Sequence, residues 1–159
     1  MSGPLRIGLV GCGKAKLEHA APAGKLYTGS LFRGALEVAT ARCGPNVMVL
    51  SAKHGLVPLE VCLEPYELSL LRLSREERRQ WGELVINELE WRFIGVEEAE
   101  LLVFAGAPYV DALRPHIREG WTLTEPLAGL QIGERLAWLA RERAALATRE
   151  SNQVLEVPR

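Results

Sequence analysis

Two short segments of the chain combine glycine with basic side chains directly after an apolar run. GCGKAK (residues 11–16) follows LRIGLV, and SAKHGLV (residues 51–57) follows VMVL. A lysine binds phosphate, polarises a carbonyl group, or acts as an amine nucleophile when it is desolvated. A histidine transfers protons near neutral pH. Lys16, Lys53 and His54 are therefore the first candidates for catalytic residues.

The glycines of the first segment fit neither of the common phosphate-binding motifs. A P-loop needs Ser or Thr after its lysine to hold magnesium, but Ala15 follows Lys14. A dinucleotide-binding turn has the order GxGxxG and opens a helix, but the order here is GxxGxG and Pro22 soon interrupts the chain. We expect a looser turn in which Gly13 admits a ligand and Lys14 supplies charge. A plain glycine turn with solvated lysines is the alternative.

Other side chains near these segments are suited to orienting a ligand. Tyr27 and Ser30 precede a helical pattern whose N-terminus favours anions, although Ser30 would also serve as a simple cap. Glu64 in the segment EPYE offers a carboxylate, and it is the fourth catalytic candidate. The plainer alternative for each charged side chain is solvation, and for Cys12 it is inert burial. The expected substrate contacts are Cys12, Gly13, Lys14, Tyr27, Ser30, Ser51, Gly55 and Tyr66.

The distribution of charge narrows the class of ligand. The net charge is −1, yet residues 1–60 carry seven Lys/Arg against three Glu, a balance of +4. All four lysines lie between Lys14 and Lys53, whereas the other basic residues are fifteen arginines. This pattern favours a local anionic ligand over a broad face that binds duplex nucleic acid. With one aspartate and three cysteines that form no CxxC pair, we expect no metal, no disulfide framework and no cofactor.

Apolar runs alternate with helical patterns along the chain. This order predicts an α/β fold, a three-layer sandwich around a four-stranded, mainly parallel sheet. Right-handed crossovers place the C-terminal ends of the strands, and the segments that follow them, at one edge. Ser74 with Glu77 is a capping-box signature. The expected strands are 5–12, 47–52, 99–106 and one within 121–127, and the expected helices are 28–43, 74–95, 108–117 and 129–148.

The length of 159 residues fits one domain. We expect it to span residues 1–148, followed by a C-terminal tail at 149–159. No apolar run approaches the roughly 20 residues that cross a bilayer, and the first residues do not resemble a signal peptide. A cytoplasmic protein without membrane contact is therefore expected.

Several motifs together resemble a family of small bacterial and phage proteins defined only as a domain of unknown function. The family's pattern is similar to the Cys-Gly-Lys-x-Lys turn, a Pro-Ala and Leu-Tyr-Thr segment, SAKHGLV, and Glu-Pro-Tyr. The late stretch EPLAGLQIGERLAWL also resembles the end of that family. In this chain the motifs are residues 12–16, 22–28, 51–57, 64–66 and 125–139.

A more distant resemblance is to a domain of archaeosine synthase, which modifies a deazaguanine base in tRNA. Cys12 with Lys16, Tyr27 with Ser30, and the segment 55–58 occur in the same order. That domain is similar to the uracil-DNA-glycosylase type of α/β fold. The resemblance implies a nucleobase or nucleoside held at the strand ends.

These observations favour an enzyme that acts on a nucleobase, nucleoside or nucleotide, free or within a nucleic acid. Its chemistry would be glycosidic-bond cleavage or transfer, or base modification. Lys16 and Lys53 would bind or activate the substrate, His54 would shuttle a proton, and Glu64 would position a hydroxyl group or water. Two alternatives stay open: a non-catalytic nucleotide-sensing or adaptor module that uses the same pocket, and an interaction protein whose apolar helix faces form an oligomer.

Overall fold

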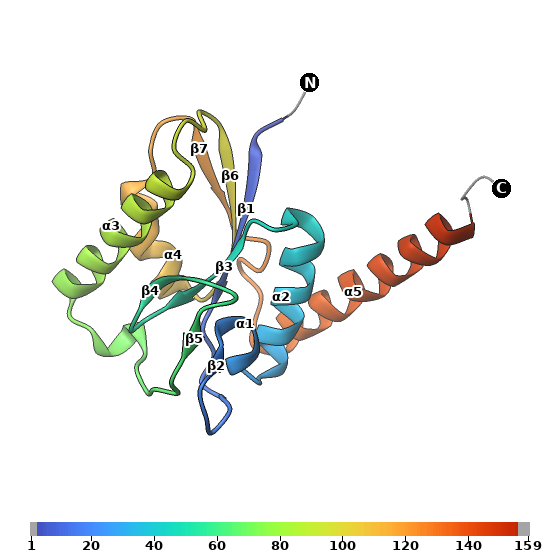
Figure 1. The fold of residues 1–159 in the computed structure, drawn as a ribbon, viewed down its shortest axis with the longest axis horizontal. Coiled ribbons are helices and arrows are strands. Elements are labelled where there is room, and N and C mark those ends of the chain that lie inside the picture. The colour runs from blue at the N-terminus through green and yellow to red at the C-terminus, as the bar shows by residue number, and fades with distance from the viewer. Residues whose placement is uncertain (1–2, 156–159) are drawn as a thin grey trace.

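The structure is a computed structural model that describes residues 3–155, and its elements form three layers (Figure 1). The middle layer is a five-stranded sheet with the order β4-β3-β1-β6-β7. β3, β1, β6 and β7 are parallel, whereas β4 runs antiparallel to β3. The strands are β1 (Leu5–Gly11), β3 (Val47–Ser51), β4 (Gly55–Pro58), β6 (Ala99–Phe104) and β7 (Trp121–Thr124).

The α/β architecture is confirmed, but the expectation of four strands is corrected by β4. Its sequence GLVP directly follows Lys53 and His54, and we interpreted it as part of a long irregular segment. Leu56 and Val57 are buried and pair with β3 in a tight antiparallel connection. Pro58 is tolerated because it is the last residue of an edge strand, where no partner strand needs its missing N–H. The sheet is therefore mixed.

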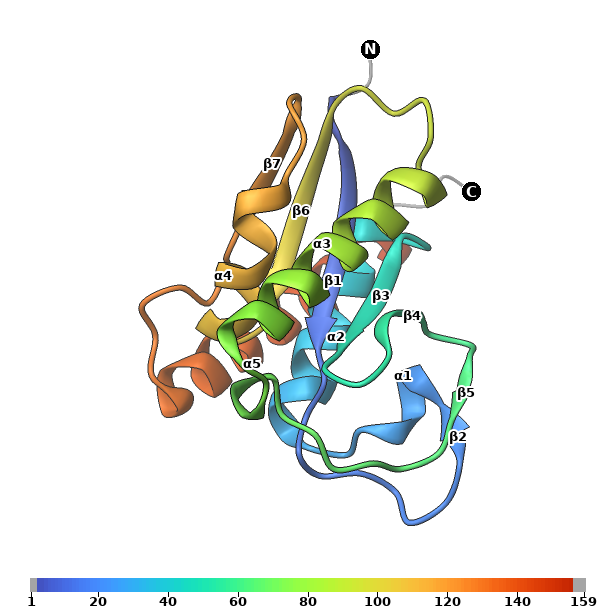
Figure 2. The same cartoon turned by 90° about the vertical axis from the view of Figure 1, so that its left-hand side faces the viewer.

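Helices cover both faces of the sheet (Figures 1 and 2). One face is covered by α2, and α5 packs against α2. The other face is covered by α3, which packs against α4. The longer helices are α2 (Ser30–Cys43), α3 (Arg75–Arg92), α4 (Ala107–Leu113) and α5 (Ile132–Leu155).

The two faces of β1 show how its sequence builds the core. Successive side chains of a strand point to opposite faces: Ile7 and Leu9 are fully buried in the cluster under α3, and Val10 is buried in the cluster under α2. Gly8 also faces α2, because a Cβ placed there would lie 3.2 Å from the Cβ of Ala39. The lack of a side chain at Gly8 lets α2 approach the strand closely.

The helix ends follow the sequence only in part. The capping box of α3 is confirmed, because the Glu77 N–H donates to Ser74 Oγ (3.1 Å) and the Ser74 N–H donates to Glu77 Oε1 (2.9 Å). At α2 the expected Ser30 cap is wrong. The cap residue is Gly29, which supplies no capping side chain, and Ser30 is the first helical residue. The first-turn N–H groups of α2 are thus left without a side-chain acceptor.

Besides β4, short elements occupy residues 13–27 and 53–73, between the expected strands and helices. They are β2 (Ala21–Pro22), α1 (Ala23–Leu26), β5 (Cys62–Leu63) and the 3₁₀ helix η1 (Leu70–Arg72). β2 and β5 form a two-stranded antiparallel ladder that brings the segments before Tyr27 and Tyr66 together. A second 3₁₀ helix, η2 (Arg114–His116), directly follows α4.

The last helix, α5, projects away from the body of the molecule (Figure 1). It continues to Leu155, so residues 149–155 of the expected tail are helical, and residues 156–159 lie outside the described part. Ion pairs of Arg42 with Glu142 (2.8 Å) and of Arg143 with Glu37 (2.7 Å) hold its first half against α2. No helix among the described residues is long and apolar enough to span a membrane.

Candidate functional site

The sheet places the two basic glycine segments side by side, as expected from the parallel order of β1 and β3. The backbone N–H of Cys12 donates to the Leu50 carbonyl oxygen (2.9 Å). The chain then turns outward, and Lys16 forms an antiparallel bridge with Tyr27. GCGKAK, Tyr27 and SAKHGLV therefore meet at the C-terminal ends of these two strands.

The hydroxyl group of Tyr66 is the centre of a buried hydrogen-bond network. It lies 2.6 Å from the Tyr27 hydroxyl and 2.6 Å from Ser51 Oγ. The His54 backbone N–H donates to the same Ser51 oxygen (3.0 Å), and Trp81 Nε1 donates to the Ser51 carbonyl oxygen (2.9 Å). These bonds fix the end of β3 and join it to the loop that carries Tyr66. We call Tyr27, Ser51 and Tyr66 the tyrosine cluster.

Two lysines converge on the ring of Tyr66. Lys16 Nζ lies 4.7 Å from the ring centroid and Lys53 Nζ lies 5.9 Å from it, both within the range of a cation–π interaction. The His54 imidazole meets the same ring at 5.3 Å between centroids, with the two planes nearly perpendicular. Two positive charges and an imidazole are thus gathered on one aromatic side chain.

Burial determines the protonation of this group. Tyr27 and Ser51 are fully buried, and burial raises the pKa of the Tyr27 hydroxyl. Burial also raises the pKa of Tyr66, with a further contribution from Cys12. Both phenols therefore stay protonated at neutral pH. The pKa of His54 is lowered, first by partial burial and second by the charge of Lys53, so its imidazole is neutral at pH 7.

A cavity of about 390 Å³ opens beside the tyrosine cluster, between the C-terminal ends of β1 and β6. We call it the edge cavity. Its volume lies in the range of small-ligand sites. It is lined by the turn after β1, the first turn of α2, the start of α4 and the N-terminal half of α5. Side chains that could contact a ligand there are Cys12, Lys14, Ser30, Phe32, Tyr109 and Arg135.

Phe32 connects the edge cavity to the tyrosine cluster. It lines the cavity, and its ring centroid lies 4.8 Å from that of Tyr27. Within the cavity wall, Cys12 Sγ lies 3.2 Å from the Tyr109 hydroxyl. The buried Tyr27 therefore packs behind the Phe32 side of the cavity wall.

Comparison with known families covers the part of the chain that contains both groups. Residues 7–141 match a protein family described as a family of unknown function, DUF6884. The chain belongs to this family. The match confirms the expected family of unknown function, and it includes the whole tyrosine cluster and the whole edge cavity. No curated protein matches the chain.

In this DUF6884 protein, most of the predicted site residues fall into two neighbouring groups, and Glu64 lies apart from both. Cys12, Gly13, Lys14 and Ser30 line the edge cavity. Lys16, Tyr27, Ser51, Lys53, His54 and Tyr66 form or surround the tyrosine cluster. Glu64 is exposed, and its carboxylate makes no hydrogen bond or ion pair with any described residue.

Gly55 has a backbone role in the DUF6884 chain. Its φ of +72° is a conformation that favours glycine. It does not end the sheet, because it is the first residue of β4. Gly55 therefore allows the tight connection that keeps Lys53 and His54 at the strand end.

Two cavity residues, Tyr109 and Arg135, were not predicted from the sequence. Tyr109 lies in AGAPYV, a segment after an expected strand, and that position was the available signal. Arg135 lies far along the chain on α5, where it donates to the Leu130 carbonyl oxygen (2.9 Å). No local pattern distinguishes Arg135 from the other arginines of that helix.

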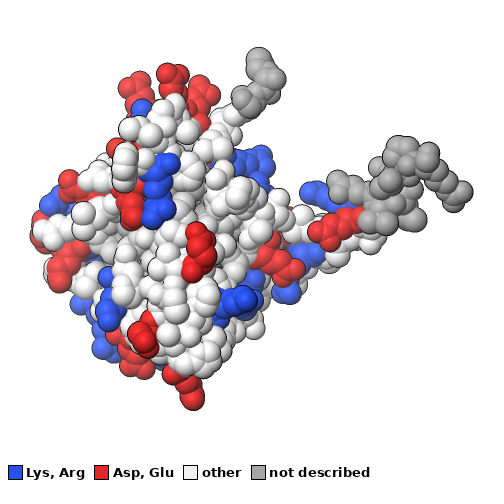
Figure 3. All heavy atoms as spheres, viewed as in Figure 1, with Lys and Arg blue, Asp and Glu red and all other residues white. Residues whose placement is uncertain are grey.

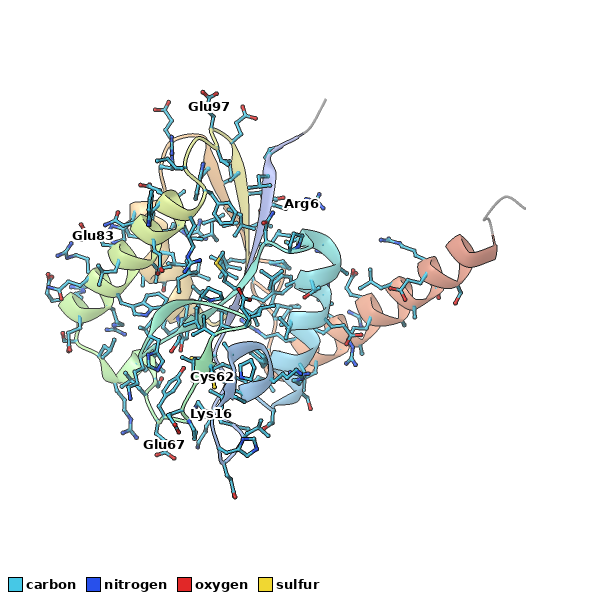
Figure 4. The ribbon with its side chains drawn as sticks, viewed as in Figure 1. Arg6, Lys16, Cys62, Glu67, Glu83 and Glu97 are labelled. Carbon is cyan, nitrogen blue, oxygen red and sulfur yellow. The ribbon has the colours of Figure 1, made fainter. Side chains whose placement is uncertain are left out.

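Both signs of charge occur at each end of the sheet. Figure 4 shows Lys16 with Glu67 at one end of the molecule, and Glu97 at the other, with Arg6 in the upper part. Glu97 and Glu98, which precede β6, are both exposed. The face in Figure 3 carries interspersed acidic and basic side chains without a large patch of one sign. This arrangement suits an anion bound at one edge better than a duplex bound across a face.

The described residues contain no group of three or more His, Cys, Asp or Glu side chains that could hold a metal ion. The titratable groups at the edge are instead lysines, tyrosines, a thiol and one imidazole. They are suited to anion binding, hydrogen bonding and proton transfer.

Proposed function

We propose that this protein is an enzyme that acts on a nucleobase, nucleoside or nucleotide at the C-terminal edge of its sheet. The observation that carries the proposal is the convergence of GCGKAK, Tyr27, SAKHGLV and Tyr66 beside the edge cavity. These segments come from different parts of the sequence and meet at one edge of the sheet. Ligands of α/β proteins bind at such an edge.

The lining of the edge cavity supports an anionic ligand with an aromatic part. Lys14 and Arg135 supply positive charge, and the first turn of α2 directs N–H groups without a capping side chain toward the same space. A helix N-terminus adds to the attraction for anions. Phe32 and Leu136 present apolar surface on which a base would pack.

The polar groups suggest how chemistry would proceed at this site. Burial, with a further contribution from Cys12, raises the pKa of Tyr109, so its hydroxyl group stays protonated and can donate a hydrogen bond inside the cavity. Neutral His54 is a proton acceptor at the neighbouring tyrosine cluster, and Lys16 and Lys53 beside it would hold an anionic group of the substrate. An imidazole that accepts a proton is suited to base catalysis at a glycosidic bond or on a base.

The same proposal includes a more specific fold class, the uracil-DNA-glycosylase type of α/β fold. The motif order Cys12–Lys16, Tyr27–Ser30 and residues 55–58 resembles the archaeosine-synthase domain. Three of these segments meet at the sheet edge. We take this as support for a uracil-DNA-glycosylase-like fold and for a nucleobase as the ligand.

A nucleotide-sensing or adaptor module is the second candidate, and one observation favours it. The lining of the edge cavity contains no carboxylate and no imidazole among the described residues. A cavity so lined binds an anion well but has few groups for hydrolysis. Tight nucleotide binding without turnover, lost in Lys14→Ala, would select this candidate.

The test is a turnover and binding panel of nucleosides, nucleotides and tRNA. The wild-type protein should convert at least one member, and Lys53→Ala should lower its kcat/KM by about tenfold or more, since a charge-assisted contact contributes about 1.5–3 kcal/mol. Lys25→Ala is the matched control, because Lys25 is an exposed lysine on α1. Absence of both turnover and binding across the panel would refute the proposal.

A further inference from the structure

A second cavity lies on the other side of α4 from the edge cavity. It has a volume of about 600 Å³ and is enclosed by the N-terminal part of α3, by α4 and by η2. Its charged or polar lining consists of Arg75, Glu76, Arg78, Arg79, Asp111 and His116. We call it the arginine groove. Nothing in the proposed function uses these residues.

Two of the three arginines in the arginine groove are available to a ligand. The Arg79 guanidinium is occupied by Glu76 (2.6 Å) and Glu83 (3.2 Å). Within the described residues, Arg75 and Arg78 have no carboxylate within 4.0 Å. They are three residues apart on α3, so they lie on neighbouring positions of one helix surface. Paired guanidinium groups bind phosphate strongly and with defined geometry.

His116 provides an independent indication that the groove is polar and that a hydrogen-bonding group is missing from it. Its Nε2 is the one buried side-chain nitrogen or oxygen without a hydrogen-bond partner among residues whose side chains are described. An unsatisfied buried polar group is costly and needs a physical explanation. A water or ligand oxygen that enters after a small movement of the ring would satisfy it.

The start of α4 forms the wall between the two cavities. Gly106 and Tyr109 line the edge cavity, whereas Ala107, Pro108 and Asp111 line the arginine groove. A helix with its side chains is about 10–12 Å across. That width corresponds to about three nucleotides at the roughly 3.4 Å spacing of a stacked strand. A short strand that crosses the start of α4 would therefore reach both cavities.

We infer that the substrate is a single-stranded nucleic acid, with one base in the edge cavity and flanking phosphates in the arginine groove. This inference rests on the proposed function and names its substrate class. A base can enter the edge cavity only when it is unpaired or turned out of a helix. The mixed surface charge and the two free arginines favour a short single-stranded contact over a duplex face.

The first arm of the test needs no variant. Binding of a nucleoside monophosphate, and of five-residue single-stranded DNA and RNA, is measured by titration at low salt. The oligonucleotides should bind at least tenfold more tightly than the monophosphate, and the tighter of the two will identify the sugar. Equal affinity of monophosphate and oligonucleotides would overturn the inference while leaving the proposed function intact.

The second arm removes the groove charges with Arg75→Gln/Arg78→Gln. Oligonucleotide affinity should fall about tenfold and its salt slope should decrease by about 1.4, two contacts at about 0.7 each, while monophosphate affinity is unchanged. Arg141→Gln/Arg149→Gln is the control, because it removes the same charge from the projecting helix α5. Unchanged oligonucleotide binding in the groove variant would overturn the inference.

The third arm uses a heptaglutamate peptide as the probe for an acidic protein segment. It should bind at least tenfold more weakly than the oligonucleotides at the same ionic strength, because it lacks a base for the edge cavity. Equal affinity would overturn the inference. Failure of every probe to bind, the monophosphate included, would instead refute the proposed function and this inference with it.

Discussion

At the scale of single residues, the hydroxyl group of Tyr66 connects the parts of the candidate site. It lies within hydrogen-bond distance of Tyr27 and Ser51, which are both fully buried. The ammonium groups of Lys16 and Lys53 lie over the ring of Tyr66. A buried network of this kind stabilises the fold only when each member has a partner. The tyrosine cluster therefore holds the lysines in place.

Removal of the Tyr66 hydroxyl group should destabilise the folded protein. Tyr66→Phe leaves the Tyr27 and Ser51 hydroxyl groups without their shared partner, so the free energy of unfolding should fall by about 1–3 kcal/mol. Urea denaturation measures the change. Tyr109→Phe is the control, because it breaks one contact, to the half-buried Cys12, and should cost less. A Tyr66→Phe cost no larger than that of the control would contradict the network.

The pKa of His54 offers a test of its contact with Lys53. Because its pKa is lowered in the folded state, the unfolded chain binds more protons as the pH falls through about 6.5, and stability falls with it. Lys53→Gln should raise the His54 pKa only partly toward its ordinary value, since burial is the larger cause. NMR titration of the imidazole measures this, with exposed His19 as the internal reference. An unchanged or lower His54 pKa in the variant would count against the contact.

At the scale of elements, α3 and α4 approach each other closely at Gly82. Gly82 makes this approach, since a Cβ at that position would overlap the Ala112 carbonyl oxygen and come within 3.3 Å of His116. The arginine groove and the Tyr109 side of the edge cavity both depend on the position of α4.

A methyl group at Gly82 should therefore separate these helices. Gly82→Ala should lower the free energy of unfolding by about 3 kcal/mol, the upper part of the usual range for overpacking. The control is Gly133→Ala in α5, where a Cβ meets nothing within 4 Å; it should be neutral or stabilise by up to about 1 kcal/mol. Thermal or urea unfolding compares the two. Similar stabilities for both variants would show that α3 and α4 adjust freely.

The elements that the sequence predicts best are those with a strong local pattern. The run VMVLS is buried on both faces, and Ser74 with Glu77 defines the start of α3. We did not predict the edge strand β4, because two buried residues, Leu56 and Val57, are too few to show the apolar/polar alternation of a strand. The strand with which they pair is determined by the arrangement of the whole sheet. The α2 cap was assigned to the wrong residue because Gly29 supplies no side-chain signal.

At the scale of the whole molecule, the sequence predicts which loops meet but not which side chains line the cavity. Parallel strand order alone brings GCGKAK next to SAKHGLV. The division into a sealed tyrosine cluster and an open edge cavity depends on packing around Phe32 and Tyr27, which no local pattern encodes. Arg135 reaches the cavity only because α5 returns across α2.

Three lysines lie together at one edge of the sheet. Lys14, Lys16 and Lys53 gather near the C-terminal ends of β1 and β3. A local group of positive charges attracts an anion, and the effect weakens as salt rises. All three lysines lie within residues 7–141, which match DUF6884.

A crystal structure of the wild-type protein with a saturating nucleoside monophosphate tests the central claim most directly. The account predicts that the base lies in the edge cavity against Phe32 and that the phosphate lies near Lys14 and Arg135. A monophosphate that binds in solution but lies elsewhere in the crystal, with the edge cavity empty, would contradict the account.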